Sequence, residues 1–213
     1  MNPNERTIEY AYVFGVINKY APSSLLDVGT GKTAFPALVK ACGIEVASID
    51  RDESQIAQNP CVRGGYCSFN IIRENLLETS IIKKFDMITC ISVLEHNLDH
   101  DLIVGKMSEM LTPERGVIVL TFPYNENEYI PNAYKLPEAG YGRNEPPTNI
   151  CQMYSREVVR RWEESYNLEL VDQEHWQAFT GKYWTYGKRL YPPIKTSKDQ
   201  IHQLSCLVLK SRG

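Results

Sequence analysis

The most constraining feature of this sequence is a short apolar run that ends in a glycine-rich turn. Leu25-Leu26-Asp27-Val28 has the character of a buried strand, and Gly29-Thr30-Gly31-Lys32-Thr33 follows it directly. The next apolar run, residues 44–49, ends at Asp50. In such a unit, glycines let the backbone approach a ligand, and the second strand aims a carboxylate at a ribose. The pattern therefore predicts a site for a cofactor that contains a nucleoside.

Apolar runs of strand length alternate with segments of helical spacing over most of the chain. Such alternation indicates an α/β domain with a mostly parallel sheet and helices on both faces. We expect a Rossmann-like sheet of seven strands, of which the last is antiparallel. The expected strands are residues 25–28, 44–49, 66–69, 85–91, 117–121, 168–171 and 204–209, and the expected helices are residues 6–20, 33–43, 98–111 and 155–166.

The bulk composition is that of a globular protein with one domain. The chain has 213 residues, of which 43% are hydrophobic and 23% charged, so we expect a single domain over residues 1–213. It has no apolar run of about 18 residues and no signal-peptide pattern at its start. The six cysteines include no C-x-x-C pair. We therefore expect a cytoplasmic protein without a membrane span or a disulfide framework.

The charge is distributed unevenly along the chain. The net charge is −3, yet residues 179–213 contain seven Lys or Arg residues and one acid, Asp199. A basic segment on an acidic body favours an anionic small molecule as substrate, unless the segment is only a solvated basic loop. The acidic body argues against a large nucleic-acid surface. The sequence says nothing of the oligomeric state.

Two other nucleotide sites compete for the glycine turn. A phosphate-binding loop needs a glycine five residues before Gly31-Lys32-Thr33, and Leu26 occupies that position. Gly29-x-Gly31-x-x-Ala34 with Asp50 also fits the alanine form of the dinucleotide fingerprint. An NAD-dependent oxidoreductase would normally need a further substrate domain, for which this chain has little room.

A third interpretation uses more of the sequence. Leu-Leu-Asp-Val-Gly-Thr-Gly from residue 25, Ile-Asp at residues 49–50, Phe-Asp-Met-Ile-Thr-Cys-Ile-Ser-Val-Leu-Glu-His from residue 85 and Leu-Thr-Pro-Glu-Arg-Gly-Val-Ile-Val-Leu-Thr-Phe-Pro from residue 111 occur in order. Together they resemble the class I S-adenosylmethionine-dependent methyltransferases over residues 6–172, with residues 204–210 as the last strand. The resemblance implies S-adenosyl-L-methionine as cofactor.

The resemblance also implies which residues hold the cofactor. Glycines bring the backbone to the amino-acid tail and the sulfonium, Asp27 orients the turn or the ammonium group, and Asp50 accepts the ribose hydroxyls. Asn70 stands where the family often has an acid for the adenine amine, and Ile71 and Val93 would flank the adenine or ribose. The expected cofactor contacts are Asp27, Gly29, Thr30, Gly31, Asp50, Arg51, Asn70, Ile71, Ser92 and Val93.

The segment after the fourth expected strand is the predicted place of chemistry. In this fold Ser92-Val93-Leu94-Glu95-His96 would lie beside the methyl group, and His96 is the candidate general base because imidazole titrates near neutrality. Some methyltransferases with a metal here carry Glu-x-x-Glu-His. Ser92 replaces the first glutamate, so we expect no metal. A structural role for His96 remains the alternative.

Two segments are predicted to form the substrate side of the site, residues 122–153 and 179–202. The first has no periodic pattern, and a loop of that length is usually functional or disordered. The expected substrate contacts are Glu95, Tyr124, Tyr183, Lys188 and Arg189. The favoured hypothesis is O-methylation of a sugar or nucleotide-linked metabolite. The alternatives are a non-catalytic cofactor-binding or regulatory subunit and, less in accord with the motifs, an NAD-dependent oxidoreductase.

Overall fold

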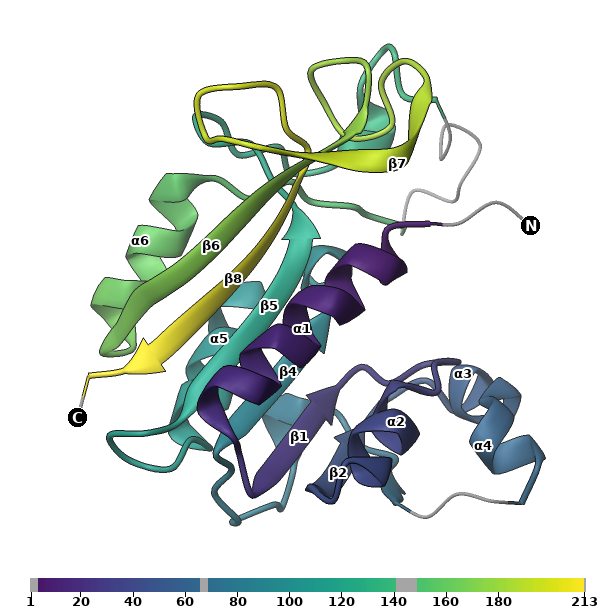
Figure 1. Ribbon diagram of the computed structural model, residues 1–213, viewed down its shortest axis with the longest axis vertical. Coiled ribbons are helices and arrows are strands. Elements are labelled where there is room, and N and C mark those ends of the chain that lie inside the picture. Colours follow the sequence, from purple (N-terminus) through teal and green to yellow (C-terminus); the bar gives the residue numbers. More distant parts are fainter. Residues whose placement is uncertain (1–3, 66–68, 141–148, 213) are drawn as a thin grey trace.

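A single mixed sheet of eight strands runs through the molecule (Figure 1). The computed structural model describes residues 4–65, 69–140 and 149–212. Along the sheet the strand order is β3-β2-β1-β4-β5-β8-β6-β7. The strands are β1 Ser24–Val28, β2 Glu45–Ile49, β3 Asn70–Ile72, β4 Met87–Ile91, β5 Val117–Pro123, β6 Leu168–Phe179, β7 Arg189–Thr196 and β8 Leu204–Ser211.

The strands from β3 to β5 are parallel, and β8 is antiparallel to both of its neighbours, β5 and β6. The chain starts at β1, proceeds outward to β3, and then returns to place β4 on the other side of β1. The strand order therefore reverses between β1 and β4. In open α/β sheets, ligands bind in the crevice outside the carboxyl ends of the strands at such a switch point.

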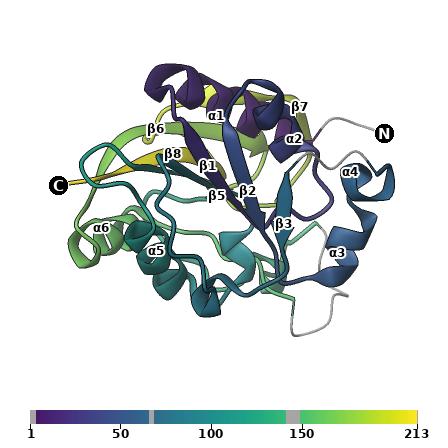
Figure 2. The ribbon, with the colours of Figure 1, turned by 90° about the horizontal axis from the view of Figure 1, so that it is seen from below.

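Helices cover both faces of the sheet (Figure 2). Helices α1 and α2 pack with one buried cluster, and α5 and α6 pack with the other. The helices are α1 Arg6–Tyr20, α2 Phe35–Ala41, α3 Glu53–Gln58, α4 Pro60–Arg63, α5 His100–Glu109 and α6 Arg156–Ser165, with short 3-10 turns η1 Leu76–Glu78, η2 Leu94–His96 and η3 Ala133–Lys135. No described helix is both long and apolar enough to span a membrane.

Continuous apolar runs in the sequence form the central strands because both of their faces are covered. Leu26 belongs to the cluster on the α5 side and Leu25 to the cluster on the α1 side. In β4, Ile88 belongs to the cluster on the α5 side and Met87 to the cluster on the α1 side. Successive side chains of a strand point to opposite faces, so a strand buried on both faces requires apolar residues at nearly every position.

The predicted fold class is confirmed, with one strand more than expected. Strand β7 is an edge strand that pairs with β6 in the segment expected to form only loops, and β6 continues to Phe179 instead of ending near residue 171. Pro192 and Pro193 lie within β7, and an edge strand tolerates proline because its outer side needs no N–H donor. The third strand begins at Asn70, after its expected range of 66–69, of which 66–68 lie outside the described residues.

A buried carboxylate fixes α1 to the carboxyl ends of two central strands. Glu9 is fully buried, and its Oε1 accepts hydrogen bonds from the hydroxyls of Ser92 and Thr121, the latter at 2.7 Å. Its Oε2 accepts from Arg6 at 3.1 Å, and Arg6 also donates to the carbonyl of Ile91 at 2.8 Å. Burial raises the pKa of Glu9, while Arg6 and the two hydroxyls act in the opposite direction.

Replacing Glu9 with alanine is expected to lower the free energy of unfolding by about 2–3 kcal/mol, because two hydroxyls lose their acceptor and Arg6 loses its partner. Urea unfolding followed by circular dichroism measures this loss. Glu53→Ala is the matched control, since Glu53 and Arg73 form an exposed pair with 3.9 Å between nitrogen and oxygen. It should change the stability by less than about 0.5 kcal/mol. Equal losses in the two variants would contradict the assigned role of Glu9.

Candidate active site

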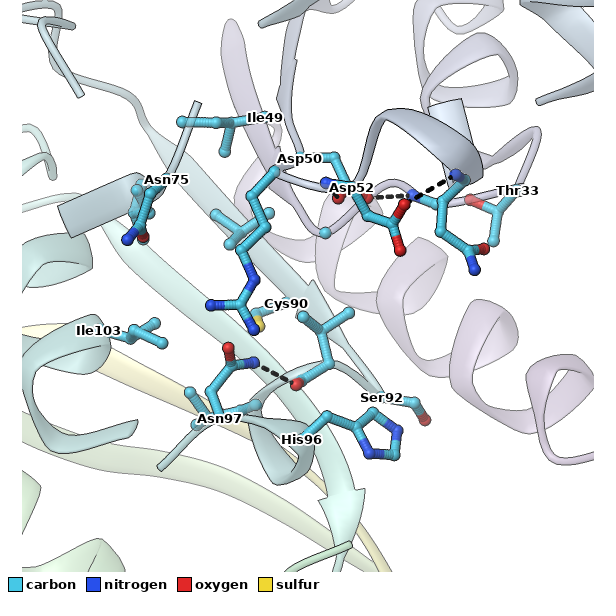
Figure 3. Close-up of a pocket in the computed structure, with 18 of the residues that line it drawn as sticks. Thr33, Ile49, Asp50, Asp52, Asn75, Cys90, Ser92, His96, Asn97 and Ile103 are labelled. Carbon is cyan, nitrogen blue, oxygen red and sulfur yellow. Dashed lines mark hydrogen bonds between the residues drawn. The ribbon is translucent and has the colours of Figure 1, made fainter. Parts of the chain in front are cut away.

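A cavity of about 530 Å³ lies at the carboxyl ends of the central parallel strands (Figure 3). This volume is within the range of about 300–1,000 Å³ that is usual for small-molecule sites. Asp50 and Thr33 lie at one end of the view, and His96 and Asn97 at the other. The lining residues are Arg6, Val28, Gly29, Gly31, Lys32, Thr33, Ile49, Asp50, Arg51, Asp52, Gln55, Glu74, Asn75, Leu76, Cys90, Ser92, Val93, Leu94, His96, Asn97 and Ile103.

The turn after β1 requires glycine for two separate reasons. Gly29 has a φ of +77°, a conformation that residues with a side chain rarely adopt. A Cβ atom at this position would lie 2.5 Å from both methyl carbons of Val93, the residue that follows Ser92 beyond β4. The N–H of Gly29 donates to the carbonyl of Ile49 at 2.8 Å. The turns after β1 and β4 therefore touch at the place where the switch point opens.

Asp27 holds the glycine turn from inside. It is 3% exposed, and its carboxylate accepts from the hydroxyl of Thr30 at 2.6 Å and from that of Thr89 at 2.8 Å. Burial raises the pKa of Asp27 to about 6, against the effect of these two donors. Neither Asp27 nor Thr30 lines the cavity, although both were expected to contact the cofactor. Of the two roles expected for Asp27, the contacts correspond to orienting the turn.

Asp50 connects the ends of β1 and β2 at the cavity wall. Its Oδ2 accepts from the N–H of Gly31 at 2.7 Å, and its Oδ1 accepts from the N–H of Asp52 at 2.9 Å. An ionised carboxylate has about four lone-pair sites, so each oxygen can accept a further hydrogen bond. Asp50 and Arg51 both line the cavity, as do Gly29 and Gly31.

The residues that follow β3 differ from the expected adenine contacts. Ile71 packs against the cluster under α1 and does not line the cavity, while the side chain of Asn70 lies outside the described residues. Glu74 and Asn75 line it instead. Because β3 ends at Ile72, later than expected, the polar residues beyond its carboxyl end lie farther along the chain. A strand placed at residues 70–72 would have put Glu74 and Asn75, instead of Asn70, beyond its carboxyl end.

The segment after β4 presents His96 at the cavity wall. Its Nδ1 lies 2.7 Å from the carbonyl oxygen of Ile150. A carbonyl oxygen only accepts hydrogen bonds, so Nδ1 carries a proton. Of the two ring nitrogens, Nε2 is then the one that can accept a proton. The side chain of His96 is 49% exposed, and both Ser92 and Val93 line the cavity with it.

Helix α5 starts at His100, whereas His96 ends the preceding 3-10 turn η2. His100 is 7% exposed and packs edge-on against Tyr154 and Trp162. The two histidines therefore have different surroundings. His100 belongs to the buried aromatic layer between α5 and α6, whereas His96 belongs to the cavity.

Glu95, which is expected to contact the substrate, lies behind the cavity wall. Its side chain is 4% exposed, its Oε1 is 3.8 Å from Nε2 of His96, and its Oε2 has no hydrogen-bond partner. Burial raises the pKa of Glu95 to about 7, and the neighbouring His96 lowers it less. Glu95 therefore faces the interior beside the histidine and is absent from the lining of the cavity.

The residues that hold this segment in place are not among those predicted from the sequence. Gln152 is 1% exposed, and its amide nitrogen donates to the carbonyl of Asn97 at 2.8 Å. The hydroxyl of Tyr154 donates to the carbonyl of Leu94, also at 2.8 Å. These residues come from the long segment that has no periodic pattern in the sequence. Only its tertiary contacts identify it as the support of η2.

The other expected substrate contacts lie away from the described cavity lining. Tyr124 is fully buried, and its hydroxyl donates to Glu126 at 2.8 Å. Tyr183 donates to Glu128 at 2.7 Å. Arg189 forms an ion pair with Glu5 at 2.6 Å and lies over the ring of Phe179, whereas Lys188 is exposed. Tyr124 is therefore a core residue, and its contact with the acceptor stays a prediction.

The two expected substrate-side segments pack on each other. Ile130, Met153 and Trp184 belong to one buried cluster that also includes Phe179 and Leu204. This cluster lies beyond the carboxyl end of β5, at the upper end of the molecule in Figure 1. Segments that are far apart in the sequence thus form one cap beside the cavity, attached to its wall through the contacts of Ile150 and Gln152.

Comparison with known proteins agrees with the fold. Residues 9–173 match the model of a family described as a methyltransferase domain. The chain is 24% identical over 186 residues to the ubiquinone biosynthesis O-methyltransferase of Coxiella burnetii, which covers 85% of this chain and 73% of that protein.

Solved structures share the architecture at low sequence identity. The N-methyltransferase NodS of Bradyrhizobium japonicum WM9, in complex with S-adenosyl-L-homocysteine, has a TM-score of 0.64 and 18% identity, with 100% of this chain and 89% of NodS covered. TehB of Haemophilus influenzae has a TM-score of 0.63 and 15% identity, with 94% of this chain but only 62% of the TehB chain covered. Since the family model matches most of its length, this chain belongs to the class I S-adenosylmethionine-dependent methyltransferases.

Proposed function

We propose that this protein methylates a hydroxyl oxygen of a small anionic acceptor, such as a sugar phosphate or a nucleotide-linked sugar, with His96 as the general base. The observation that carries the proposal is the orientation of His96. Its Nδ1 is held by the carbonyl of Ile150, and its ring lines the same cavity as Asp50 and the glycine turn.

The cavity wall has the groups that S-adenosylmethionine requires. The free lone pairs of Asp50 would accept the ribose hydroxyls, and Glu74 or Asn75 would meet the adenine. Arg6, which lines the cavity from α1, would pair with the carboxylate of the amino-acid tail. The close approach of Gly29 to Val93 leaves its turn without a side chain between the backbone and the ligand.

The cofactor supplies an activated methyl group, so the protein has to align the acceptor and remove its proton. A hydroxyl is a weak nucleophile until a base takes its proton, whereas a neutral amine attacks with its own lone pair. A neutral imidazole whose Nε2 can accept a proton therefore favours an oxygen acceptor. The Coxiella burnetii relative is named an O-methyltransferase, which agrees with an oxygen acceptor, whereas NodS is named an N-methyltransferase.

The proposal of an anionic acceptor rests on fewer cations than the sequence suggests, because several of them pair with acids. Arg189 pairs with Glu5, Lys182 with Glu128 and Lys195 with Glu174, all acids from outside the basic segment. Lys188 is exposed in the second segment of the cap, and Lys32 and Arg51 line the cavity. We assign recognition of an acceptor phosphate or carboxylate to these three cations.

Asp50→Asn is expected to weaken the binding of S-adenosylhomocysteine about 10–100-fold, because a carboxylate that accepts hydrogen bonds becomes a neutral amide. Isothermal titration calorimetry measures the dissociation constant. Asp199→Asn makes the same change at an exposed residue far along the chain and should leave the affinity unaltered. Binding of NAD, with no heat from S-adenosylhomocysteine, would overturn the proposal in favour of an oxidoreductase.

His96→Ala is expected to lower the rate of methyl transfer about 10²–10⁴-fold, the usual contribution of a general base, with the affinity for S-adenosylhomocysteine nearly unchanged. Transfer is measured with S-adenosylmethionine labelled in its methyl group and a deproteinised pool of small metabolites. Anion exchange then separates charged from neutral products. Leu98→Ala, at a side chain that is 78% exposed, is the control and should retain the wild-type rate.

Three results of this experiment would count against the proposal. Wild-type turnover in His96→Ala would reject His96 as the base. Label in the neutral fraction alone would reject an anionic acceptor. A wild-type protein that binds S-adenosylhomocysteine but labels no fraction would instead fit a non-catalytic cofactor-binding subunit.

A further inference from the structure

Three side chains of metal-binding type meet beyond the carboxyl end of β5. Glu126 follows β5, His175 lies in β6, and His202 lies two residues before β8. One ligand atom from each lies within 4.8 Å of the others. Among the described residues this is the group of three whose donor atoms converge in this way. None of the three lines the cavity of the candidate active site.

The contacts of His202 fix its tautomer. Its Nδ1 lies 2.7 Å from the carbonyl of Gln200, which can only accept, so Nδ1 carries the proton. Its Nε2 accepts a hydrogen bond from the backbone N–H of Glu126 at 3.2 Å, and an N–H group can only donate. His202 is therefore a neutral imidazole whose Nε2 lone pair faces the cluster. Histidines that bind metals commonly donate their other nitrogen to a backbone carbonyl in this way.

His175 has a buried nitrogen without a partner. Its Nε2 has no hydrogen-bond partner in the structure and lies 3.6 Å from Oε2 of Glu126. The side chain is 11% exposed. An unpaired buried polar atom is destabilising, so it calls for an explanation. An imidazole nitrogen at this distance from a carboxylate oxygen gains little from that neighbour unless a proton or a metal ion lies between them.

Glu126 is oriented by a core residue. The hydroxyl of Tyr124 donates to Oε2 of Glu126 at 2.8 Å, and the Tyr124 ring stacks on that of His202 with their centroids 5.7 Å apart. Tyr124 is fully buried, so this donor is held rigidly. Partners that orient a ligating carboxylate are a regular part of metal sites. The side chain of Glu126 is 21% exposed, which leaves solvent access to the cluster.

We propose that Glu126, His175 and His202 bind one divalent transition-metal ion of the Zn²⁺ type. Bonds of about 2.0–2.2 Å in a tetrahedral site place ligand atoms about 3.4 Å apart. The separation of 3.6 Å between His175 and Glu126 is close to this value, and the rest of the cluster needs only a small side-chain movement. Two imidazoles with one carboxylate favour zinc or its transition-metal neighbours over Mg²⁺ and Ca²⁺, which prefer oxygen ligands.

Three protein ligands leave one position of a tetrahedral ion open. That position would hold water or an oxygen of another molecule, as in catalytic zinc sites. Loading the site breaks the hydrogen bond between Nε2 of His202 and the N–H of Glu126. The sequence predicts no metal beside His96, and the three ligands of this cluster are far apart in the sequence.

The test uses the full chain, stripped with a chelator and titrated with Zn²⁺ against a chromophoric competitor, without S-adenosylmethionine. We expect one equivalent of Zn²⁺ to bind. His175→Ala and His202→Ala should each weaken binding more than about 100-fold, and Tyr124→Phe about 10–100-fold as the loss of an outer partner. His96→Ala and Cys42→Ser, at a half-exposed histidine and an exposed thiol, should leave the affinity unchanged.

Co²⁺ in place of Zn²⁺ tests the ligand set in the wild-type chain, so the result does not depend on whether a variant folds. Nitrogen and oxygen ligands give visible bands of a four- or five-coordinate ion, without the near-ultraviolet charge-transfer band of a thiolate ligand. A thiolate band, failure to bind one equivalent, or binding that folded His175→Ala and His202→Ala leave unchanged would overturn the proposal. Because the cofactor is absent, these outcomes are separate from failure of the methyltransferase proposal.

Discussion

The close contact between Gly29 and Val93 is the constraint on which the rest of the site depends. It joins the turns after β1 and β4, the two strands between which the order of the sheet reverses. A side chain at Gly29 would force these turns apart, and the positive φ of this residue would strain it as well. The buried carboxylate of Asp27 strengthens the same junction by bonding Thr30 in one turn and Thr89 in β4.

Much of this arrangement could be predicted because its signals are local. The apolar runs, the glycine turn and the acid at the end of β2 lie within short stretches, so the sequence indicates both the strands and the cofactor edge. Strand β3 is the exception. It is three residues long and has no strong apolar run, so a small error in its position changes which polar residues are expected beyond its carboxyl end. The fold class tolerates such an error, but an individual contact does not.

The acceptor side could not be predicted because its determinants are tertiary. In the sequence, Tyr124 is an aromatic residue in a loop after a strand. Only its ring contacts with Phe122 and His202 show that it is buried. The basic segment has an excess of cations in sequence, yet the fold brings Glu5, Glu128 and Glu174 to three of them. Charge counted along a chain is a poor guide where the neutralising acids come from other elements.

The two halves of the site are therefore positioned by different parts of the chain. The cofactor side is fixed by contacts among β1, β2 and β4, whereas the ring of His96 is oriented from the cap through the carbonyl of Ile150. Any acceptor that shifts residues 150–154 would also turn the proposed base. The features that select the acceptor of this enzyme should accordingly be sought in the cap, whose residues orient the proposed base.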